Sequence, residues 1–325
     1  MRKIRYSQAI NEALHQLLAT NKKTFVIGQG VTSPWYVGTT TVGLIDRFGP
    51  KRVFDTPVSE SATTGLAVGA ALTGMRPIVV HPRMDFMYYA MDQIANQAAN
   101  WYYMFGSQLS IPLTIWGIIN RGGEQGAQHS QAIQSIFAHI PGLKVVMPST
   151  PYDAKGLLIA SVNDNNPVVY IDDRWLYEFE GDVPEEMYSV EIGKGIIRRK
   201  GADVTIVATS YMVHKALEAA KHLEKEGTSA EIIDLRTIKP LDKKLIYDSV
   251  KKTGRLVVVD AAWKTCGVGA EISATIAESN LLTKLKAPIM RVSLPDTPAP
   301  ASCSLENEYY PNEKDIVSTV KKLLY

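Results

Sequence analysis

Glu60 is the acidic side chain best placed in the sequence to do chemistry. It ends the segment D-T-P-V-S-E, in which Pro57 closes an expected strand at 52–54 and Ser59 is suited to cap a helix. Glu60 then falls in the first helical turn, where the helix dipole favours a negative charge. Two glycines one turn apart follow, so another backbone or a ligand is expected close by. A dipole-stabilising surface glutamate is the alternative at this point.

Common chemical motifs are missing from the sequence. The stretch Gly267-Val268-Gly269 lacks the third glycine and the downstream acid of a dinucleotide-binding fingerprint. There is no phosphate-binding G-x-x-x-x-G-K-[ST] loop, no G-x-S-x-G elbow and no histidine pair at metal-ligand spacing. By elimination, the polar features that remain are Glu60, the glycine-rich loop that carries His129, and the aromatic stretch around Phe86.

The elements that must position these residues alternate between short apolar runs and helix-period segments. This alternation predicts α/β layers with mostly parallel sheets. Expected strands are 24–28, 52–54, 77–80, 113–116, 144–147, 168–171, 204–208, 230–234, 256–259 and 289–292. Expected helices include 7–19, one after Glu60, 87–105, 211–225, 242–253, 269–278 and 313–324. The acidic, non-periodic segment 172–191 is expected to be a linker, which predicts domains at 1–185 and 186–325.

Composition excludes several classes of function. A length of 325 residues makes two domains the default, and a net charge of +2 with scattered Lys and Arg predicts no nucleic-acid-binding face. Two cysteines cannot make a disulfide framework or a cysteine-built metal site. No apolar run approaches 18 residues and the first residues lack the apolar core of a signal peptide, so a cytoplasmic location without membrane contact is expected.

Several longer motifs together resemble one family. They read D-T-P-V-S-E at 55–60, D-Q-I-A-N-Q-A-A at 92–99, Q-H-S-Q at 128–131, P-G-L-K-V-V-M-P-S-T-P-Y-D-A-K-G-L-L at 141–158, E-I-I-D-L-R-T-I-K-P-L-D at 231–242 and G-V-G-A-E-I at 267–272. The chain resembles, from about Tyr6 to its last helix, the beta subunit of the thiamine diphosphate-dependent decarboxylase component of 2-oxoacid dehydrogenase complexes for pyruvate, branched-chain acids or acetoin, in the transketolase-like superfamily.

The resemblance implies two doubly wound α/β domains, a thiamine-pyrimidine-binding domain followed by a transketolase C-terminal-type domain. In this family an alpha subunit holds the diphosphate and Mg²⁺ with a G-D-G…N motif. Here the one G-D pair is Gly181-Asp182, in the expected linker. The resemblance therefore implies an alpha partner in an alpha2-beta2 heterotetramer, and a lipoyl acyltransferase core is a further expected partner.

The resemblance also assigns roles to individual residues. Glu60 matches the catalytic glutamate, which hydrogen-bonds a ring nitrogen of the aminopyrimidine so that the cofactor can lose its thiazolium proton. Phe86 matches the aromatic ring that stacks on the pyrimidine. His129 matches a histidine that exchanges a proton during acyl transfer, which suits a group that titrates near neutrality. Gln29 and Tyr89 are further expected to lie at the cofactor.

A potassium ion is a weaker expectation from the same resemblance. The turn A-S-V-N-D-N-N-P resembles a loop that holds potassium through carbonyl oxygens in some members of the family. The candidate ligands are Ala160, Asn163 and Asn165.

Departures from the family pattern gather on the expected substrate side. Gln29 replaces an acid, His81 and Arg83 follow a strand that usually carries a glutamate, and Trp116 stands where arginine is usual. Arg121 and Glu124 add charge to a loop that is usually neutral, and Tyr88 and Tyr89 add phenols. His81, Arg83, Trp116 and Arg121 are therefore the candidate substrate-side residues.

Three functions stay open at this stage. The first is a 2-oxoacid decarboxylase subunit that passes the acyl unit to lipoyl, and the second is a carboligase that uses a sugar or another non-lipoyl acceptor. The third is a non-catalytic scaffold subunit. The sequence indicates neither the 2-oxoacid, nor the acceptor, nor the identity of the alpha chain.

Overall fold

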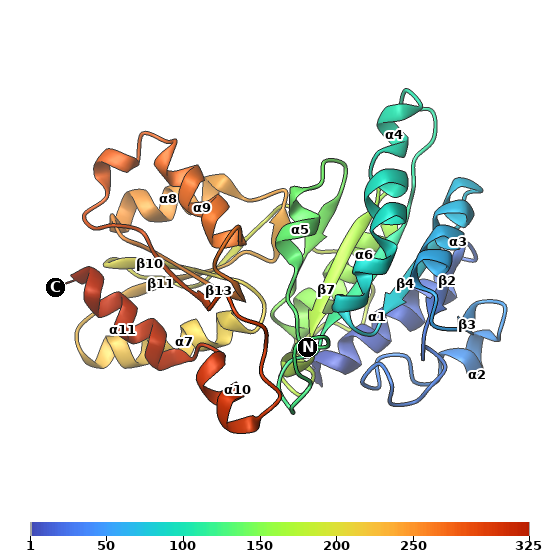
Figure 1. Cartoon of the computed structure of the whole chain (residues 1–325), viewed down its shortest axis with the longest axis horizontal. Helices are drawn as coiled ribbons and strands as arrows, with labels where there is room; N and C mark the ends of the chain where they lie inside the picture. The colour runs from blue at the N-terminus through green and yellow to red at the C-terminus, as the bar shows by residue number, and fades with distance from the viewer. Residues whose placement is uncertain (1, 325) are drawn as a thin grey trace. The chain divides into compact units, whose positions relative to one another are not determined.

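The computed structural model describes residues 2–324 and divides into two units (Figure 1). The first unit comprises the chain up to Arg121 and then Ile136–Ile192. The second comprises Gly122–Ser135 and the chain from Gly193 onward. The expected domain boundary at 185/186 stays a prediction, and each unit is described by itself below.

The first unit is built on six parallel strands. They are β2 (Thr24–Gly28), β3 (Val53–Asp55), β4 (Arg76–His81), β5 (Thr114–Ile119), β6 (Lys144–Val146) and β7 (Val168–Asp173), and they lie in the order β6-β7-β5-β4-β2-β3. All residues of β2, β5 and β7 are buried, as in a parallel sheet that is covered on both faces. The predicted α/β class is therefore confirmed for this unit.

The helices of this unit are α1 (Tyr6–Thr20), α2 (Leu44–Phe48), α3 (Glu60–Leu72), α4 (Trp101–Met104), α5 (Gln134–His139, which begins in the second unit) and α6 (Pro151–Asn163). The single helix expected at 87–105 is wrong. The chain forms a 3-10 helix, η1 (Met84–Ala90), then a π-helix, η2 (Asp92–Ala98), then α4. The amide of Ala99 bonds the carbonyl of Ile94, which is the wider π spacing. Apolar residues at helical spacing do not distinguish these helix types.

The carboxyl ends of the parallel strands place several candidate residues at one edge of the sheet. Gly28 ends β2, Asp55 ends β3 and His81 ends β4, and the chain leaves each strand there toward Gln29, Glu60 and Phe86. This edge is where ligands bind in open parallel sheets.

The expected linker at 172–191 is largely part of the first unit. Asp172 and Asp173 belong to β7, and a short 3-10 helix, η3 (Arg174–Leu176), follows. Strand β8 (Glu180–Val183) then pairs antiparallel with β1 (Arg2–Arg5). The buried ammonium of Lys155 holds the following turn, because it contacts Glu12 Oε1 at 2.6 Å and the carbonyls of residues 184, 185 and 186 at 2.7, 3.1 and 2.9 Å.

The second unit has a five-stranded sheet in the order β14-β13-β10-β11-β9. Its strands are β9 (Ile196–Arg199), β10 (Val204–Ala208), β11 (Ala230–Asp234), β13 (Leu256–Trp263) and β14 (Met290–Leu294). All of them run parallel except β9. A further short strand, β12 (Thr237–Lys239), follows β11 in the sequence. Helices α7 (Met212–Lys225) and α11 (Glu313–Leu324) cover one face, and α8 (Lys243–Thr253) and α9 (Val268–Ala277) cover the other (Figure 1). The apolar core between α7, α11 and the sheet includes Ile206, Val259 and Ile316.

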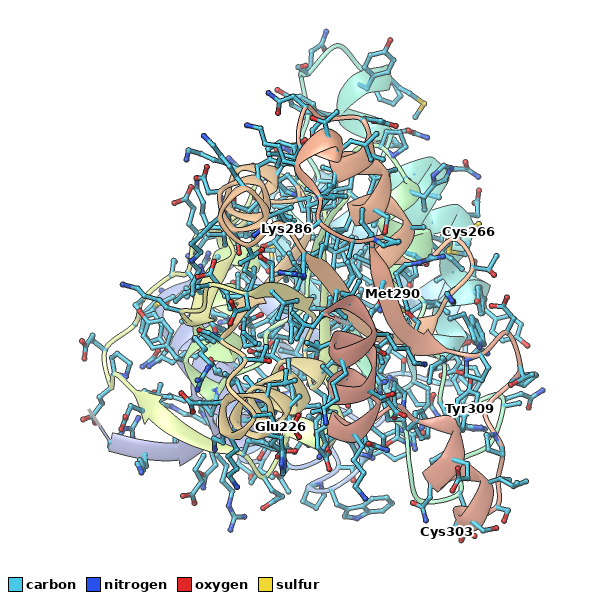
Figure 2. The ribbon with its side chains drawn as sticks, turned by 90° about the vertical axis from the view of Figure 1, so that its left-hand side faces the viewer. Glu226, Cys266, Lys286, Met290, Cys303 and Tyr309 are labelled. Atoms are coloured by element: carbon cyan, nitrogen blue, oxygen red, sulfur yellow. The ribbon has the colours of Figure 1, made fainter. Side chains whose placement is uncertain are left out.

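Two short helices complete the second unit, η4 (Leu282–Lys284) and α10 (Cys303–Tyr309). Figure 2 shows Cys303 and Tyr309 near the two ends of α10, with Met290 on the sheet. Trp263 at the end of β13 anchors α10, since its Nε1 donates to the Thr297 carbonyl at 2.9 Å and lies 3.2 Å from the Tyr309 hydroxyl.

Replacing Lys155 with methionine tests the anchoring of this turn. The change removes a buried cation and leaves Glu12 and three carbonyls without their donor, so we expect a loss of about 3 kcal/mol in the free energy of unfolding. Urea titration followed by circular dichroism measures it. Lys221→Met, at an exposed position, is the matched control and should change stability by less than about 0.5 kcal/mol. Equal urea midpoints for the two variants would show that the Lys155 cluster is not a stabilising contact.

Candidate active site

A small hollow of about 10 Å³ in the first unit brings several predicted residues together. It lies at the carboxyl edge of the sheet and is lined by the ends of β2 and β4, the first turn of α3 and the start of η1. Its lining residues are Gly28, Gln29, Thr56, Pro57, Ser59, Glu60, Thr63, Val80, His81, Pro82 and Phe86. Of the residues predicted at the cofactor, Glu60, Phe86 and Gln29 line it.

The floor of the hollow depends on a close approach of backbones. Gly28 has φ of +154°, and a Cβ atom placed on it would lie 2.4 Å from the Val80 carbonyl oxygen on the neighbouring strand. No side chain fits there, so β2 and β4 meet backbone to backbone below the hollow.

Glu60 is half-buried at the first position of α3. Its place in the first turn is as predicted, but the expected side-chain cap is wrong: the Ser59 hydroxyl donates to the Val58 carbonyl at 2.7 Å and not to the helix. Within residues 2–324, the Glu60 carboxylate has no hydrogen-bond or ion-pair partner. An unpaired carboxylate in a partly apolar hollow is an arrangement that a ligand with a hydrogen-bonding edge would satisfy.

Phe86 supplies the aromatic wall of the hollow, while Tyr89 lies outside it. The two rings are 6.5 Å apart between centroids and tilted by 35°, and Tyr89 is 70% exposed. The hollow thus combines an aromatic face, a carboxylate and the apolar surface of Val80 and Pro82, which are the kinds of group that a flat heteroaromatic ring contacts. The predicted cofactor contact of Tyr89 stays a prediction, because Tyr89 does not line the hollow.

His81 is a neutral member of the wall. Its Nε2 lies 3.3 Å from the hydroxyl of Thr64, which is one turn after Glu60 on α3. Burial lowers the pKa of His81 to about 4. At neutral pH His81 therefore offers hydrogen bonds but no positive charge.

Arg83 is half-buried just beyond the hollow, where its Nη1 donates to the Pro82 carbonyl at 2.8 Å. Burial lowers the pKa of Arg83 from its usual value, and the neighbouring Arg174 lowers it further. Arg174 in turn donates to the Tyr36 carbonyl. Two cations thus lie near one another at the end of the sheet.

The remaining two substrate-side candidates are buried among side chains of the first unit, and their role at the substrate stays a prediction. Trp116 is fully buried within β5 and packs edge-on against Tyr170, with ring centroids 6.3 Å apart. Arg121 is paired with buried Asp173 at 2.8 Å and lies 5.3 Å from the ring centroid of Trp175. Neither lines the hollow, because long-range partners that the local sequence does not reveal hold both side chains.

A second buried acid lies beside this ion pair. Asp172 Oδ2 accepts a hydrogen bond from the Tyr177 hydroxyl at 2.9 Å. Burial raises the pKa of Asp172 to about 7, although the bond from Tyr177 opposes that rise. Asp172 therefore titrates near neutrality without lining the hollow.

His129 falls in the second unit, half-buried in the loop Gly122–Ser135. Its amide donates to the Gly126 carbonyl at 3.4 Å, which closes a tight turn before the imidazole. The structure therefore places the two predicted catalytic side chains in different units.

The expected potassium loop already contacts a cation of the protein. Arg76 Nη1 donates to the carbonyls of Val162 and Asp164, each at 2.8 Å, and its Nη2 donates to Asn165 Oδ1 at 2.6 Å. The Ala160 carbonyl accepts from the Asp164 amide at 3.0 Å. Potassium binding by the carbonyls of Ala160, Asn163 and Asn165 stays a prediction, and Arg76 places a positive charge beside this turn.

The described chain offers few other sites. Across residues 2–324 there is no cluster of three His, Cys, Asp or Glu side chains that could hold a metal ion. No helix in this range is long and apolar enough to cross a bilayer.

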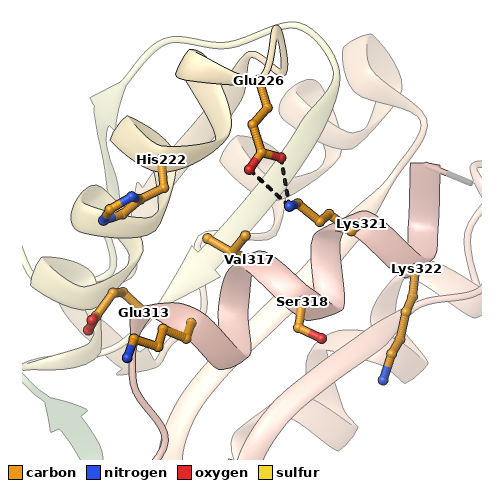
Figure 3. Close-up of a pocket in the computed structure, with 8 residues that line it drawn as sticks. His222, Glu226, Glu313, Val317, Ser318, Lys321 and Lys322 are labelled. Carbon is orange, nitrogen blue, oxygen red and sulfur yellow. Dashed lines mark hydrogen bonds and ion pairs between the residues drawn. The ribbon is translucent and has the colours of Figure 1, made fainter.

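A larger hollow in the second unit, of about 730 Å³, lies between α7 and α11 (Figure 3). Its acids are paired with lysines, Glu226 with Lys321 at 2.7 Å and Glu313 with Lys215 at 3.2 Å. It is a groove of solvated ion pairs and not a convergent set of reactive groups.

Comparison with known families matches both halves of the chain. Residues 2–179 match the transketolase pyrimidine-binding domain, and residues 193–316 match the transketolase C-terminal domain. The predicted order of the two domain types is confirmed.

Similar proteins span nearly the whole chain. The acetoin:2,6-dichlorophenolindophenol oxidoreductase subunit beta of Cupriavidus necator is 45% identical and covers 99% of this chain and 98% of that protein. The pyruvate dehydrogenase E1 component subunit beta of Bacillus subtilis is 43% identical over 98% of this chain and 97% of that protein. A solved split-gene transketolase, an inactive beta4 tetramer, has the same fold, with a TM-score of 0.82 at 24% identity over 99% of this chain and 98% of that one.

The depressed pKa of His81 predicts a pH-dependent stability. The unfolded state takes up a proton near pH 6.5 and the folded state only near pH 4, so this contribution is complete above pH 6.5 and is lost as the pH falls toward 4. Its full size is about 3 kcal/mol. Asp172 acts in the opposite direction, because its raised pKa stabilises the fold below pH 3.8 and this contribution is lost as the pH rises through 7.

A comparison of variants separates the contribution of His81 to the pH dependence of stability from that of the other titrating groups. We expect His81→Gln to lose stability less steeply than the unmodified protein between pH 6.5 and 4, as measured by urea midpoints at several pH values. His222→Gln, at an exposed histidine, should keep the original slope. Parallel curves for all three proteins would mean that His81 is not held in its neutral form.

Proposed function

We propose the function from one premise: the chain belongs to the family of transketolase-like beta subunits that includes those of pyruvate dehydrogenase E1 components. On this premise it is the beta subunit of a heteromeric thiamine diphosphate-dependent enzyme that decarboxylates a 2-oxoacid and transfers the acyl unit. A cytoplasmic location and an alpha2-beta2 assembly stay part of this proposal.

The observation that carries the proposal is the unpaired Glu60 carboxylate beside Phe86 in the hollow. Thiamine diphosphate, when bound, supplies a carbon nucleophile that adds to the 2-oxo group and accepts the electron pair released with carbon dioxide. Glu60 is placed to hold a proton at a ring nitrogen of the pyrimidine, which is the step that activates the cofactor. Phe86 and the backbone floor at Gly28 orient the ring.

The diphosphate and Mg²⁺ are assigned to an alpha partner. This assignment rests on the missing G-D-G motif in the sequence. The named relatives are likewise subunits of larger enzymes. A lipoyl acyltransferase core is the acyl acceptor if the enzyme serves a dehydrogenase complex, and binding of that core to the assembled enzyme would distinguish this case from a carboligase.

His129 is proposed to exchange a proton with the substrate during acyl transfer. A half-buried imidazole on a glycine-rich loop suits that role, because an imidazole can both donate and accept a proton and the loop can approach a ligand.

A carboligase acting on a sugar or another non-lipoyl acceptor is the second candidate. It is favoured by the polar and phenolic side chains that follow β4, namely half-buried Arg83 and exposed Tyr88 and Tyr89. Neutral His81 adds a hydrogen-bonding group to the same wall.

Replacing Glu60 with glutamine tests the leading proposal. The enzyme is produced by co-expression with the candidate alpha chain encoded next to it, and carbon dioxide release is measured over a panel of 2-oxoacids with thiamine diphosphate and Mg²⁺. We expect Glu60→Gln to reduce kcat about 10³-fold, because the amide cannot exchange the pyrimidine proton. Thiamine diphosphate binding, followed by protein fluorescence, should weaken far less.

Glu180→Gln is the matched control, at an exposed carboxylate of the same unit, and should leave turnover unchanged. Full activity of Glu60→Gln would support a scaffold role for this subunit and refute the proposed chemistry.

The second candidate has its own test. If the acceptor is a polyol, Arg83→Ala and Tyr89→Phe should each raise the KM for an aldehyde or sugar acceptor about tenfold while leaving 2-oxoacid decarboxylation nearly unchanged. Unchanged turnover of every donor and acceptor in both variants would remove these residues from the substrate site.

A further inference from the structure

The loop that carries His129 is held by a reciprocal pair of hydrogen bonds to α10. The Glu124 carboxylate accepts from the Cys303 amide at 3.3 Å, at the first residue of that helix. The Glu306 carboxylate, one turn later, accepts from the Glu124 amide at 3.0 Å. Each partner thus supplies an acceptor for a backbone amide of the other. All these groups lie in the second unit.

The backbone around Glu124 is held in an unusual conformation. Glu124 has φ of +62°, in the left-handed region that non-glycine residues rarely adopt, and Gly122, Gly123 and Gly126 have φ of 75°, 67° and 70°. A Cβ atom on Gly126 would lie 3.5 Å from Ala301, so the loop runs close to the chain just before α10. A strained residue persists where its surroundings hold it, and here its own carboxylate and amide are both bonded to α10.

The far end of the loop has a second anchor. Gln134 Nε2 donates to both carboxylate oxygens of Asp260 at 2.9 and 3.1 Å, and Thr209 donates to Asp260 Oδ1 at 2.7 Å. Asp260 lies on β13, the strand whose Trp263 also anchors α10. His129 therefore lies between two anchored ends of its loop. One end is bonded to α10, which Trp263 of β13 contacts, and the other is bonded to Asp260 of β13.

We propose that Glu124 is a positioning residue for His129, acting through its reciprocal hydrogen bonds with α10. The inference rests on the proposed function, since it assigns Glu124 to the same proton-transfer step. Glu124 is one of the residues that depart from the family pattern. Its contact with α10 restricts the motion of a glycine-rich loop. The loop therefore loses less conformational entropy when His129 meets a substrate.

The test compares three substitutions of Glu124 in the co-expressed holoenzyme. Glu124→Gln keeps an acceptor oxygen for the Cys303 amide, Glu124→Ala removes it, and Glu124→Gly removes it and relieves the left-handed strain. Glu308→Gln, an exposed carboxylate on the same helix, is the control. Hydrogen–deuterium exchange is followed for the peptides covering 122–131 and 303–309.

We expect the amides of both peptides to exchange at least about tenfold faster in the Ala and Gly variants, and at nearly the original rate in the Gln variant and the control. Equal exchange in all five proteins would overturn the anchoring contact. Protection retained in Glu124→Gly alone would show that strain and not the carboxylate controls the loop.

A double-mutant cycle with His129→Gln separates positioning from general stability. The kcat for 2-oxoacid turnover is measured with lipoamide and, in parallel, with 2,6-dichlorophenolindophenol as acceptor. In the assay that His129→Gln slows, Glu124→Ala should lower kcat about tenfold with KM nearly unchanged, and the double variant should match His129→Gln alone.

The outcomes divide cleanly between the two proposals. Additive losses, or a His129→Gln variant as fast as the unmodified enzyme in both assays, would overturn the positioning role. Absence of turnover with every 2-oxoacid in the unmodified enzyme would instead refute the proposed function, while the exchange experiment would still decide whether Glu124 anchors the loop.

Discussion

The hollow at Glu60 depends on the backbone contact between β2 and β4. In the parallel register Gly28 lies opposite Val80, and a Cβ at Gly28 would meet the Val80 carbonyl at 2.4 Å. A side chain there would force the two strands apart at the base of the hollow. Since Gln29 and His81 leave these strands at the same edge, and α3 packs against β4, the positions of Glu60 and Phe86 follow from this one approach.

Among the described residues of the first unit, the buried ion pairs contrast with half-buried Glu60, whose carboxylate has no partner there. Buried Arg121 is matched by Asp173, and buried Lys155 by Glu12 and three carbonyls. Glu60 alone among the residues lining the hollow presents a carboxylate without a partner in the described chain. Removing a charge from water costs free energy unless it is paired, so an unpaired, half-buried carboxylate in a hollow is a candidate for binding a ligand.

The sequence was sufficient where the relevant physics is local. Short apolar runs predicted the buried parallel strands, and a proline followed by Ser59 and Glu60 predicted the helix that starts at Glu60. Contacts between distant segments could not be predicted from the sequence. Arg121 was expected on the substrate side, and its buried pairing with Asp173, 52 positions away, is visible only in the fold. The contact between Glu124 and α10 joins segments 179 positions apart, and a left-handed glutamate among glycines was its one local indication.

The assignment of the two candidate catalytic side chains to different units has a consequence for specificity. Glu60 rests on a floor made by the first sheet, whereas the loop of His129 rests on α10 and β13 of the second unit. The steps proposed for Glu60 and His129 would thus be supported by separate sets of contacts, and substitutions in one set need not disturb the other. Departures from the family pattern fall in both sets, at Gln29 and His81 in the hollow and at Glu124 in the loop of His129, while the D-T-P-V-S-E segment around Glu60 is intact. A chain built in this way can keep the chemistry that activates the cofactor while the acceptor of the acyl unit changes.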